Sequence, residues 1–422
     1  MIINDDCIKH LKTLKDNTFD SCVTDPPYHL ASIVKRFGPG QKPINNHDTK
    51  IGRDGPFHKI ARGFMGQTWD GGDIAFNTKL WKQVYRVLKP GAFLLSFAAP
   101  RNYHLMATAI ENSGFEIRDQ IMWLYGSGFP KSHNIGKQMD KKLGNTRQVI
   151  GKKVRGDVQK AKEKGSGYLS DPANRNNQSQ FGYGTETLTK GDTEWEGWGT
   201  ALKPAHEPIV MARKPIEGSN VKNVLKYGTG AINIDECRVD GDKPKKWTKP
   251  RGGIWKTDKN AKADLVDNEK GRFPANVIHD GSEEVLDEFE KYGDTKSTGG
   301  GGDKTFWYDK KVGTTTTKEY PKLVGYGDVG SPAKFFYCSK ASKKEKAGTE
   351  HPTVKPVELM KYLIRLVTRK KGIVLDPFAG TGTTGEAAIL EGCKYYLIEK
   401  NKKYFKDIEN RVGKFNELFI ES

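Results

Sequence analysis

The chain has few cysteines, and their placement argues against several classes of protein. Its 422 residues include only 5 cysteines, an odd number, and no two of them form a Cys-x-x-Cys pair. This pattern disfavours a disulfide scaffold, a zinc ribbon and an iron–sulfur site. We therefore expect no metal centre and a reducing, cytoplasmic environment.

Long apolar runs and acidic residues are also scarce. No stretch approaches the roughly 18 apolar residues of a transmembrane helix, and the amino-terminal residues lack the pattern of a secretory signal. We expect no membrane partner.

Asp and Glu number 52 against 70 Lys and Arg, which gives a formal net charge of +18. This balance favours a polyanionic partner, although a generally lysine-rich proteome would produce it too.

The hydrophobic pattern divides the chain into three stretches. Residues 1–130 and 346–422 alternate β-rich runs with helical patterns, which is typical of a parallel α/β sheet. Strands are expected at 1–4, 20–24, 92–97, 117–125, 372–375 and 394–398, and helices at 7–14, 77–88, 103–112, 357–368, 383–390 and 402–412. Residues 131–345 lose this rhythm. Their tryptophans and lysines either contact a nucleic acid or belong to a loosely packed insertion with a small core of its own.

A glycine-rich turn follows one of the expected strands near the end of the chain. Leu375-Asp376-Pro377-Phe378-Ala379-Gly380-Thr381-Gly382 leads directly into the expected helix 383–390. A strand, turn and helix in this order bring backbone close to a nucleotide-like ligand, and the lack of Gly-Lys-Ser/Thr argues against a Walker loop. Glu399 ends the next strand, where a carboxylate suits the two hydroxyls of a ribose. The alternative for Glu399 is a charge at the start of the following helix.

A second motif, Asp25-Pro26-Pro27-Tyr28, follows the expected strand 20–24. Proline cannot donate to a sheet ladder, so the strand must end here, at the edge where open α/β sheets bind ligands. The Asp25 carboxylate and the Pro26 carbonyl can accept both hydrogens of an exocyclic base amine, whose lone pair is otherwise delocalised into the ring. Tyr28 can stack on a base extruded from a duplex. The alternative is an ordinary proline turn.

The two motifs together resemble those of the S-adenosylmethionine-dependent amino DNA methyltransferases. The family's catalytic motif is Asp/Asn/Ser-Pro-Pro-Tyr and its cofactor motif is Phe-x-Gly-x-Gly, here Phe378-Ala379-Gly380-Thr381-Gly382. Also similar are His351-Pro352-Thr353-Val354-Lys355-Pro356, which in the family lines the methionine end of the cofactor, and Asn4-Asp5-Asp6-Cys7, which lies near its adenine. In the second of these, Asp5 replaces the family's glycine. The order of the motifs is that of the β group.

The resemblance implies a circularly permuted, seven-stranded Rossmann-like α/β core. Its catalytic half would be residues 1–130 and its cofactor-binding half residues 346–422, with a target-recognition and DNA-binding region inserted at 131–345. The strands 394–398 and 1–4 should then be neighbours in one sheet. The resemblance assigns catalysis to Asp25, Pro26, Pro27 and Tyr28, and cofactor binding to Asp6, Cys7, His351, Thr353, Lys355, Asp376, Phe378, Ala379, Gly380, Thr381, Gly382 and Glu399.

The implied reaction moves a methyl group from S-adenosylmethionine to N6 of an adenine flipped out of duplex DNA, without a metal. Asp at the first catalytic position favours adenine, and N4 of cytosine is the alternative. RNA bases and protein glutamine are more distant alternatives. A homodimer and a cognate restriction enzyme are the further partners that the resemblance suggests.

The start of the inserted region is strongly basic. Residues 131–170 contain eleven Lys and Arg against three acidic residues and follow the expected strand 117–125. A basic arm at this place is suited to phosphate contacts beside the flipped base. We predict that Lys152, Lys153 and Arg155 bind the DNA backbone and that the arm becomes ordered on DNA. Base-edge readers are expected among polar side chains of the inserted region, without a choice among them: Arg147, Arg155, Arg175, Asn176, Asn177, Gln178 and Gln180.

Overall fold

The computed structural model describes residues 1–28, 73–126, 128, 132–154, 185–239, 245–247, 265–267, 271–291, 295–296, 305–309, 314–318, 329–330, 333, 337–338 and 354–418. The chain divides into two compact units. Unit 1 comprises Met1–Gly126 and Ala205–Ser422, and unit 2 comprises Ser127–Pro204. Within the described part of the chain, no helix has the length and apolar character needed to span a membrane.

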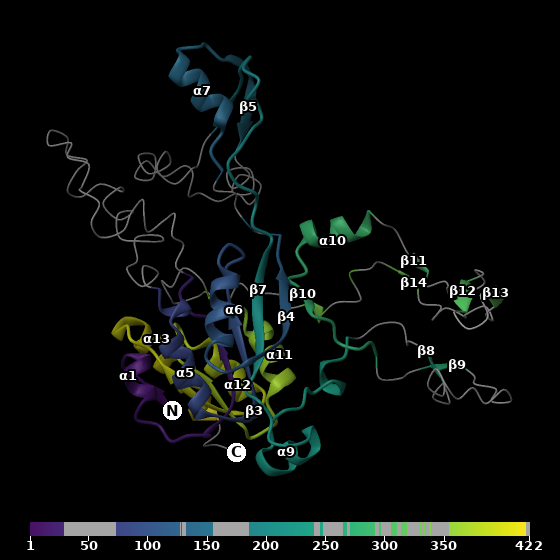
Figure 1. Ribbon diagram of the computed structural model, residues 1–422. Helices are drawn as coiled ribbons and strands as arrows, with labels where there is room; N and C mark the ends of the chain where they lie inside the picture. Colours follow the sequence, from purple (N-terminus) through teal and green to yellow (C-terminus); the bar gives the residue numbers. More distant parts are fainter. Residues whose placement is uncertain are drawn as a thin grey trace. The chain divides into compact units, whose positions relative to one another are not determined.

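Unit 1 is built on a sheet whose described strands number nine, in the order β1-β17-β16-β2-β3-β7-β4-β10-β15 (Figure 1). The strands are β1 (Ile2–Ile3), β2 (Phe19–Thr24), β3 (Leu88–Phe97), β4 (Glu116–Leu124), β7 (His206–Arg213), β10 (Val277–His279), β15 (Tyr337–Cys338), β16 (Ile373–Asp376) and β17 (Lys394–Ile398). Every neighbouring pair is parallel except the two that β7 makes with β3 and β4. The expected mostly parallel α/β core is confirmed.

The sheet has more strands than the seven that the sequence predicts. The extra strands come from the stretch 131–345, where the sequence shows no regular alternation. Strand β7 lies antiparallel between β3 and β4, and β10 and β15 extend the sheet beyond β4 (Figure 1). Part of this stretch therefore belongs to the core sheet, while residues 127–204 form unit 2. That the stretch contains the DNA-binding region stays a prediction.

The two ends of the described chain lie side by side in this sheet, as the sequence predicts. Strand β1 pairs in parallel with β17, with Ile2 opposite Leu397. The Met1 ammonium donates a hydrogen bond to the Tyr395 carbonyl at 2.8 Å, and Asn4 Nδ2 donates to the Glu399 carbonyl at 2.8 Å. A single sheet thus unites the two halves that carry the two motifs.

Helices cover both faces of the sheet, and the central strand β3 supplies apolar side chains to each. Its Leu94 packs in a core with Trp81 and the helices α1 and α5, whereas Leu95 packs in a second core with the helix α11. Successive side chains of a strand point to opposite faces, which explains why the run 92–97 is apolar throughout. The described helices of unit 1 are α1 (Cys7–Leu11), α5 (Thr78–Val87), α6 (Tyr103–Glu111), α9 (Asn220–Tyr227), α10 (Glu283–Glu290), α11 (Val357–Val367), α12 (Thr383–Leu390) and α13 (Lys402–Leu418), with short 3₁₀ turns at Ile74–Phe76 and Asp235–Cys237.

Three pairs of short antiparallel strands complete the described part of unit 1. They are β8 (Lys245–Trp247) with β9 (Leu265–Asp267), β11 (Thr295–Lys296) with β14 (Val329–Gly330), and β12 (Thr305–Asp309) with β13 (Thr314–Lys318). Each forms a separate sheet and adds no strand to the central one.

The described part of unit 2 contains the helix α7 (Ile135–Leu143) and the antiparallel pair β5 (Gln148–Val154) and β6 (Thr185–Lys190). Arg147 holds these parts together. Its guanidinium forms ion pairs with Asp140 of α7 and with Glu196, and it donates to the hydroxyl and carbonyl oxygens of Thr189 on β6. All five N–H donors of the guanidinium are used within the unit. Arg147, one of the candidates for a base-edge reader, therefore has no guanidinium donor left for a base.

Candidate active site

The two sequence motifs meet where the neighbouring strands β2 and β16 end. These strands are parallel, with Ser21 opposite Val374, so their carboxyl ends lie at one edge of the sheet. The hydroxyl of Thr24, the last residue of β2, donates to Asp376 Oδ1 at 2.6 Å. The Asp25 segment and the glycine-rich turn therefore start from adjacent points.

Asp376 joins the two motifs through its buried carboxylate. Besides the bond from Thr24, its Oδ1 accepts from the Phe378 amide at 3.0 Å, and its Oδ2 accepts from the Thr384 hydroxyl at 2.5 Å. Burial raises the pKa of Asp376 to about 6, in spite of these hydrogen bonds. The side chain is only 2% exposed. Its contacts fix the shape of the turn from Phe378 to the start of α12.

Glu399 directly follows β17 and lies beside the glycine-rich turn. Its Oε2 accepts from the Gly380 amide at 2.9 Å, and its Oε1 accepts from the Asn401 amide at 2.7 Å, just before α13. Burial raises the pKa of Glu399 to about 7. The carboxylate thus contacts the turn and also bonds an amide at the start of α13. The placement at the start of the following helix, which the sequence gives as the alternative, is therefore present, and ribose binding by Glu399 stays a prediction.

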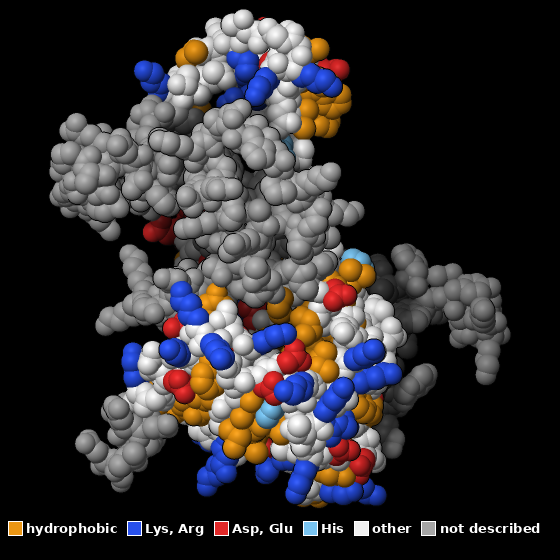
Figure 2. All heavy atoms as spheres, turned by 90° about the vertical axis from the view of Figure 1, so that its left-hand side faces the viewer, with side chains coloured by type: hydrophobic (Ala, Val, Ile, Leu, Met, Phe, Trp, Pro, Cys, Tyr) orange, Lys and Arg blue, Asp and Glu red, His pale blue; other side chains and the backbone are white. Residues whose placement is uncertain are grey.

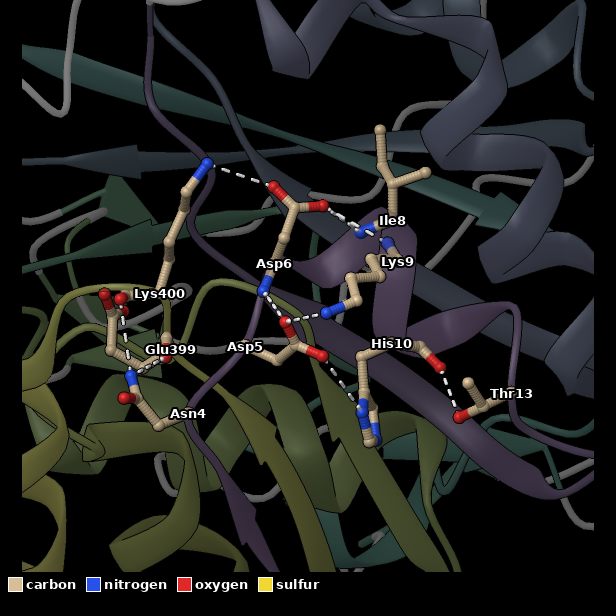
Figure 3. Close-up of polar contacts among 9 residues, drawn as sticks. All are labelled: Asn4, Asp5, Asp6, Ile8, Lys9, His10, Thr13, Glu399 and Lys400. Carbon is tan, nitrogen blue, oxygen red and sulfur yellow. Dashed lines mark hydrogen bonds and ion pairs between the residues drawn. The ribbon is translucent and has the colours of Figure 1, made fainter.

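The segment Asn4–Cys7 lies next to this edge (Figure 3). Asp6 caps α1, because its Oδ1 accepts from the Ile8 and Lys9 amides at 3.1 and 3.2 Å, and its Oδ2 lies 3.1 Å from Lys400 Nζ. Burial acts to raise the pKa of Asp6, but the helix amides and the Lys400 ammonium outweigh it and lower that pKa. The Lys400 contact brings Asp6 to the loop that follows Glu399.

Cys7 and Asp5 complete this segment. The Cys7 thiol is buried in the core, which raises its pKa to about 12 and keeps it protonated at neutral pH. The Asp5 carboxylate accepts from the Asp6 amide at 2.8 Å and lies 3.8 Å from His10 Nδ1 (Figure 3). The aspartate that replaces the family's glycine therefore stabilises the turn into α1.

A cluster of charged groups surrounds Asp25. Lys355 Nζ lies 2.6 Å from Asp25 Oδ2 and 3.1 Å from Glu207 Oε2, and the Tyr28 hydroxyl donates to Glu207 Oε2 at 2.8 Å. The ammonium also lies 5.4 Å from the centre of the Tyr28 ring and 4.8 Å from that of Phe97. Burial acts to lower the pKa of Lys355, but the two carboxylates outweigh it and raise that pKa well above its ordinary value. Lys355 is therefore a buried cation at any physiological pH.

The second oxygen of Asp25 has a different environment. Asp25 Oδ1 is buried and has no hydrogen-bond partner among the described residues. An acceptor left in this state costs about 1–3 kcal/mol, which a ligand with an N–H or O–H group would recover. Pro26, the next residue, is buried as well. Asp25 thus has one oxygen bonded to a lysine and one open oxygen, meaning one without a partner among the described residues, that can accept a hydrogen bond from a ligand.

The other residues singled out in the sequence lie elsewhere. Lys152 is exposed on β5 of unit 2, and Lys153 is on the same strand. Arg155, His351 and Thr353 lie outside the described residues. On the face drawn in Figure 2, lysine and arginine side chains are scattered among acidic and apolar ones. In the part of the chain that the structure covers, no three His, Cys, Asp or Glu side chains are grouped to hold a metal ion.

Sequence reasoning missed Glu207. It lies on β7, opposite Trp123 of β4 and inside the stretch in which no strand was expected. The apolar run Ile209–Ala212 just after it is fully buried and could have indicated a core strand. Nothing in the sequence indicates that the residue meets Lys355, which is far away along the chain.

Known proteins resemble this chain along most of its length. A family model described as DNA methylase matches residues 19–410. The type II methyltransferase M.HindIII of Haemophilus influenzae is 23% identical, over 98% of this chain and 94% of its own length. The DNA adenine methyltransferase YhdJ of Escherichia coli K12 is 50% identical over 56 residues, which are 13% of this chain and 19% of that protein.

Solved structures align along almost the whole chain, at low similarity. The M1.HpyAVI complex with S-adenosylmethionine is 13% identical and covers 98% of both chains, with a TM-score of 0.36. The cytosine-N4-specific PvuII DNA methyltransferase is 12% identical over 97% of this chain and 85% of its own, with a TM-score of 0.38.

Proposed function

The chain belongs to the DNA methylase family, and from that membership we propose that it methylates N6 of adenine in duplex DNA, with Asp25 as the acceptor for the reacting amine. Members of this family are S-adenosylmethionine-dependent DNA methyltransferases, so the cofactor, the reaction type and the DNA substrate follow from the membership. The choice of base and the roles of individual residues are the proposal.

The observation that carries the proposal is the open oxygen of Asp25. Its Oδ2 is occupied by Lys355, and its Oδ1 is buried without a partner among the described residues. One amine hydrogen would go to Oδ1 and the other to the Pro26 carbonyl. Two acceptors in these positions draw the nitrogen towards tetrahedral geometry and localise its lone pair for attack. Tyr28 would hold the flipped base by stacking.

The cofactor supplies an electrophilic methyl group on a sulfonium sulfur. Asp25 and the Pro26 carbonyl would hold the amine so that its nitrogen could accept that methyl group as the sulfur gives it up. Positive charge develops on the nitrogen beside the Asp25 carboxylate, which stabilises it. The proton leaves the nitrogen after attack, so no general base is needed before it. The residues present fit the cofactor, because the Glu399 carboxylate lies just after β17 in contact with the Gly380 amide, where ribose hydroxyls would reach it.

The methylated base can be identified directly. Duplex DNA treated with the purified protein and S-adenosylmethionine is digested to nucleosides and analysed by mass spectrometry. We expect N6-methyladenine, because the first residue of the catalytic motif is Asp25 and family members with Asp there mostly modify adenine. N4-methylcytosine without N6-methyladenine would overturn the base assignment. Stronger competition by single-stranded RNA than by duplex DNA at equal salt would move the substrate to RNA.

Cofactor affinity should rise with pH if Glu399 binds the ribose. The pKa of Glu399 is raised to about 7, so the carboxylate is largely protonated at pH 6 and largely ionised at pH 8. The ionised form is the better acceptor for hydroxyl donors. Calorimetric titration of the protein with S-adenosylmethionine should therefore give a Kd about tenfold lower at pH 8 than at pH 6.

The Glu399→Gln variant is the control for this pH effect. It should bind S-adenosylmethionine more weakly than the wild type, with little dependence on pH over the same range, because the amide does not titrate. An unchanged pH slope in Glu399→Gln would assign the titration to another group.

Neutralising Lys152, Lys153 and Arg155 together should weaken binding to every DNA sequence. The logarithm of the DNA affinity falls linearly with the logarithm of the salt concentration, and each phosphate-binding cation contributes about one unit to the steepness of that line. Removing all three should therefore make the line shallower by up to about three units. Cofactor affinity should not change, since unit 1 carries the glycine-rich turn. An unaltered slope with an altered choice of methylated sequence would instead assign base reading to these residues.

A homodimer, a cognate restriction enzyme and a cytoplasmic location stay predictions.

A further inference from the structure

Glu207 belongs to the charged cluster around Asp25, although it lies outside both sequence motifs. It reaches the cluster from β7, whose antiparallel course between β3 and β4 brings residue 207 to the edge where β2 ends. Its side chain is 20% exposed, and its Oε2 contacts two members of the cluster, Lys355 and Tyr28. It is the second carboxylate within 3.1 Å of the buried ammonium.

The first consequence concerns the orientation of Lys355. An ammonium paired with Asp25 alone could shift between the two carboxylate oxygens. Here Nζ is also held by Glu207 Oε2 at 3.1 Å and by the Tyr28 hydroxyl at 3.2 Å, so its three hydrogens have three partners. Glu207 therefore keeps Lys355 on Oδ2 of Asp25 and leaves Oδ1 open.

The second consequence concerns the ring that would stack on the base. The Tyr28 hydroxyl donates to Glu207 at 2.8 Å, and the Tyr28 carbonyl accepts from Asn102 Nδ2. Burial and the nearby carboxylates raise the pKa of Tyr28 far above its ordinary value, so the hydroxyl keeps its proton and remains a donor. Both the hydroxyl and the backbone of Tyr28 are thus held.

The third consequence is electrostatic. The cluster holds one ammonium and two carboxylates, so it contains one more acidic group than basic group. Without Glu207, the Lys355 charge would cancel that of Asp25. With it, the cluster keeps an excess of negative charge close to the point where positive charge would develop on the amine.

We propose that Glu207 is a positioning residue for methyl transfer: through Lys355 and Tyr28 it orients the open oxygen of Asp25 and the stacking ring. The inference rests on the proposed function, because it assigns a role in the reaction that Asp25 is proposed to support.

The test compares Glu207→Gln with wild type in single-turnover methyl transfer at saturating cofactor and DNA. We expect the rate to fall about 10- to 100-fold, while the Kd for S-adenosylmethionine stays within twofold. Glu207→Asp, which keeps the charge on a shorter side chain, should recover part of the rate. Glu358→Gln is the matched control: it makes the same change three residues after Lys355, in a half-buried pair with Lys361, and should leave the rate unchanged.

The pH profile separates positioning from a structural role. Removing one of the two carboxylates lowers the pKa of the buried Lys355, since burial is then opposed by Asp25 alone. The Glu207→Gln rate should therefore fall at alkaline pH, in a range where the wild-type rate is flat. A lower thermal stability with the same pH profile as wild type would overturn the proposal, as would an unchanged rate. If the wild-type protein itself fails to methylate DNA, the proposed function fails instead.

Discussion

Replacing Asp25 by alanine should abolish methyl transfer and leave cofactor binding intact. The variant lacks the oxygen that would accept the reacting amine, and the absence of one positioned group of this kind costs about 10²–10³-fold in rate. Binding of S-adenosylmethionine should not change, because Glu399 and the glycine-rich turn lie on other strands. Single-turnover transfer of labelled methyl groups to duplex DNA measures the first effect, and calorimetric titration measures the second.

Two further variants test whether the loss of activity comes from the Asp25 carboxylate itself. Asp25→Asn keeps the size of the side chain and should be nearly as inactive, because the amide lacks the charge that stabilises the cationic nitrogen. Asp16→Ala removes an exposed aspartate just before β2 that pairs with Arg86, and it should retain wild-type activity. Full activity of Asp25→Ala would show that the amine is held by other groups.

Replacing Gly382 by alanine should weaken cofactor binding by at least about tenfold. Gly382 has a φ of +83°, in the left-handed region, where a side chain costs about 1–2 kcal/mol. A Cβ there would also lie 3.0 Å from Ile408 Cγ2 and 3.3 Å from the Ile408 Cα. Relief of that contact must move the turn or α13, which displaces the amides beside Glu399.

Gly392→Ala is the matched control for this change. Gly392 also has a positive φ, +68°, but a Cβ there would meet nothing within 4 Å. Both variants carry similar backbone strain, and only Gly382→Ala disturbs the turn. Calorimetric Kd values for S-adenosylmethionine should therefore separate them. Equal weakening in both variants would attribute the effect to general destabilisation.

The regular elements of residues 1–124 and 357–412 could be predicted because their signals are local. The apolar run 92–97 reveals a strand covered on both faces, and Pro26 and Pro27 mark where β2 ends. The glycine-rich turn and Glu399 likewise lie in one short segment, so their spacing can be recognised from the sequence alone. Even the pairing of β1 with β17 followed from the order of the motifs.

The stretch 131–345 could not be predicted in the same way. Strand β7 is a single antiparallel strand whose two partners, β3 and β4, both precede it in the chain. The apolar run of β7 can indicate a strand, but the residues around it do not show that this strand lies between β3 and β4. The use of Arg147 as a centre of ion pairs within unit 2 depends in the same way on where Asp140 and Glu196 fold.

The sequence by itself determined the α/β class, the two motifs and the strand ends at which they lie. Only the tertiary structure decided that Lys355 meets Asp25, 330 residues away, and that Glu207 meets Tyr28, 179 residues away. The physical reason is that a charged side chain carries no local signal of its partner. Its partner depends on the order of strands in the sheet, which is set by burial of apolar side chains elsewhere in the chain.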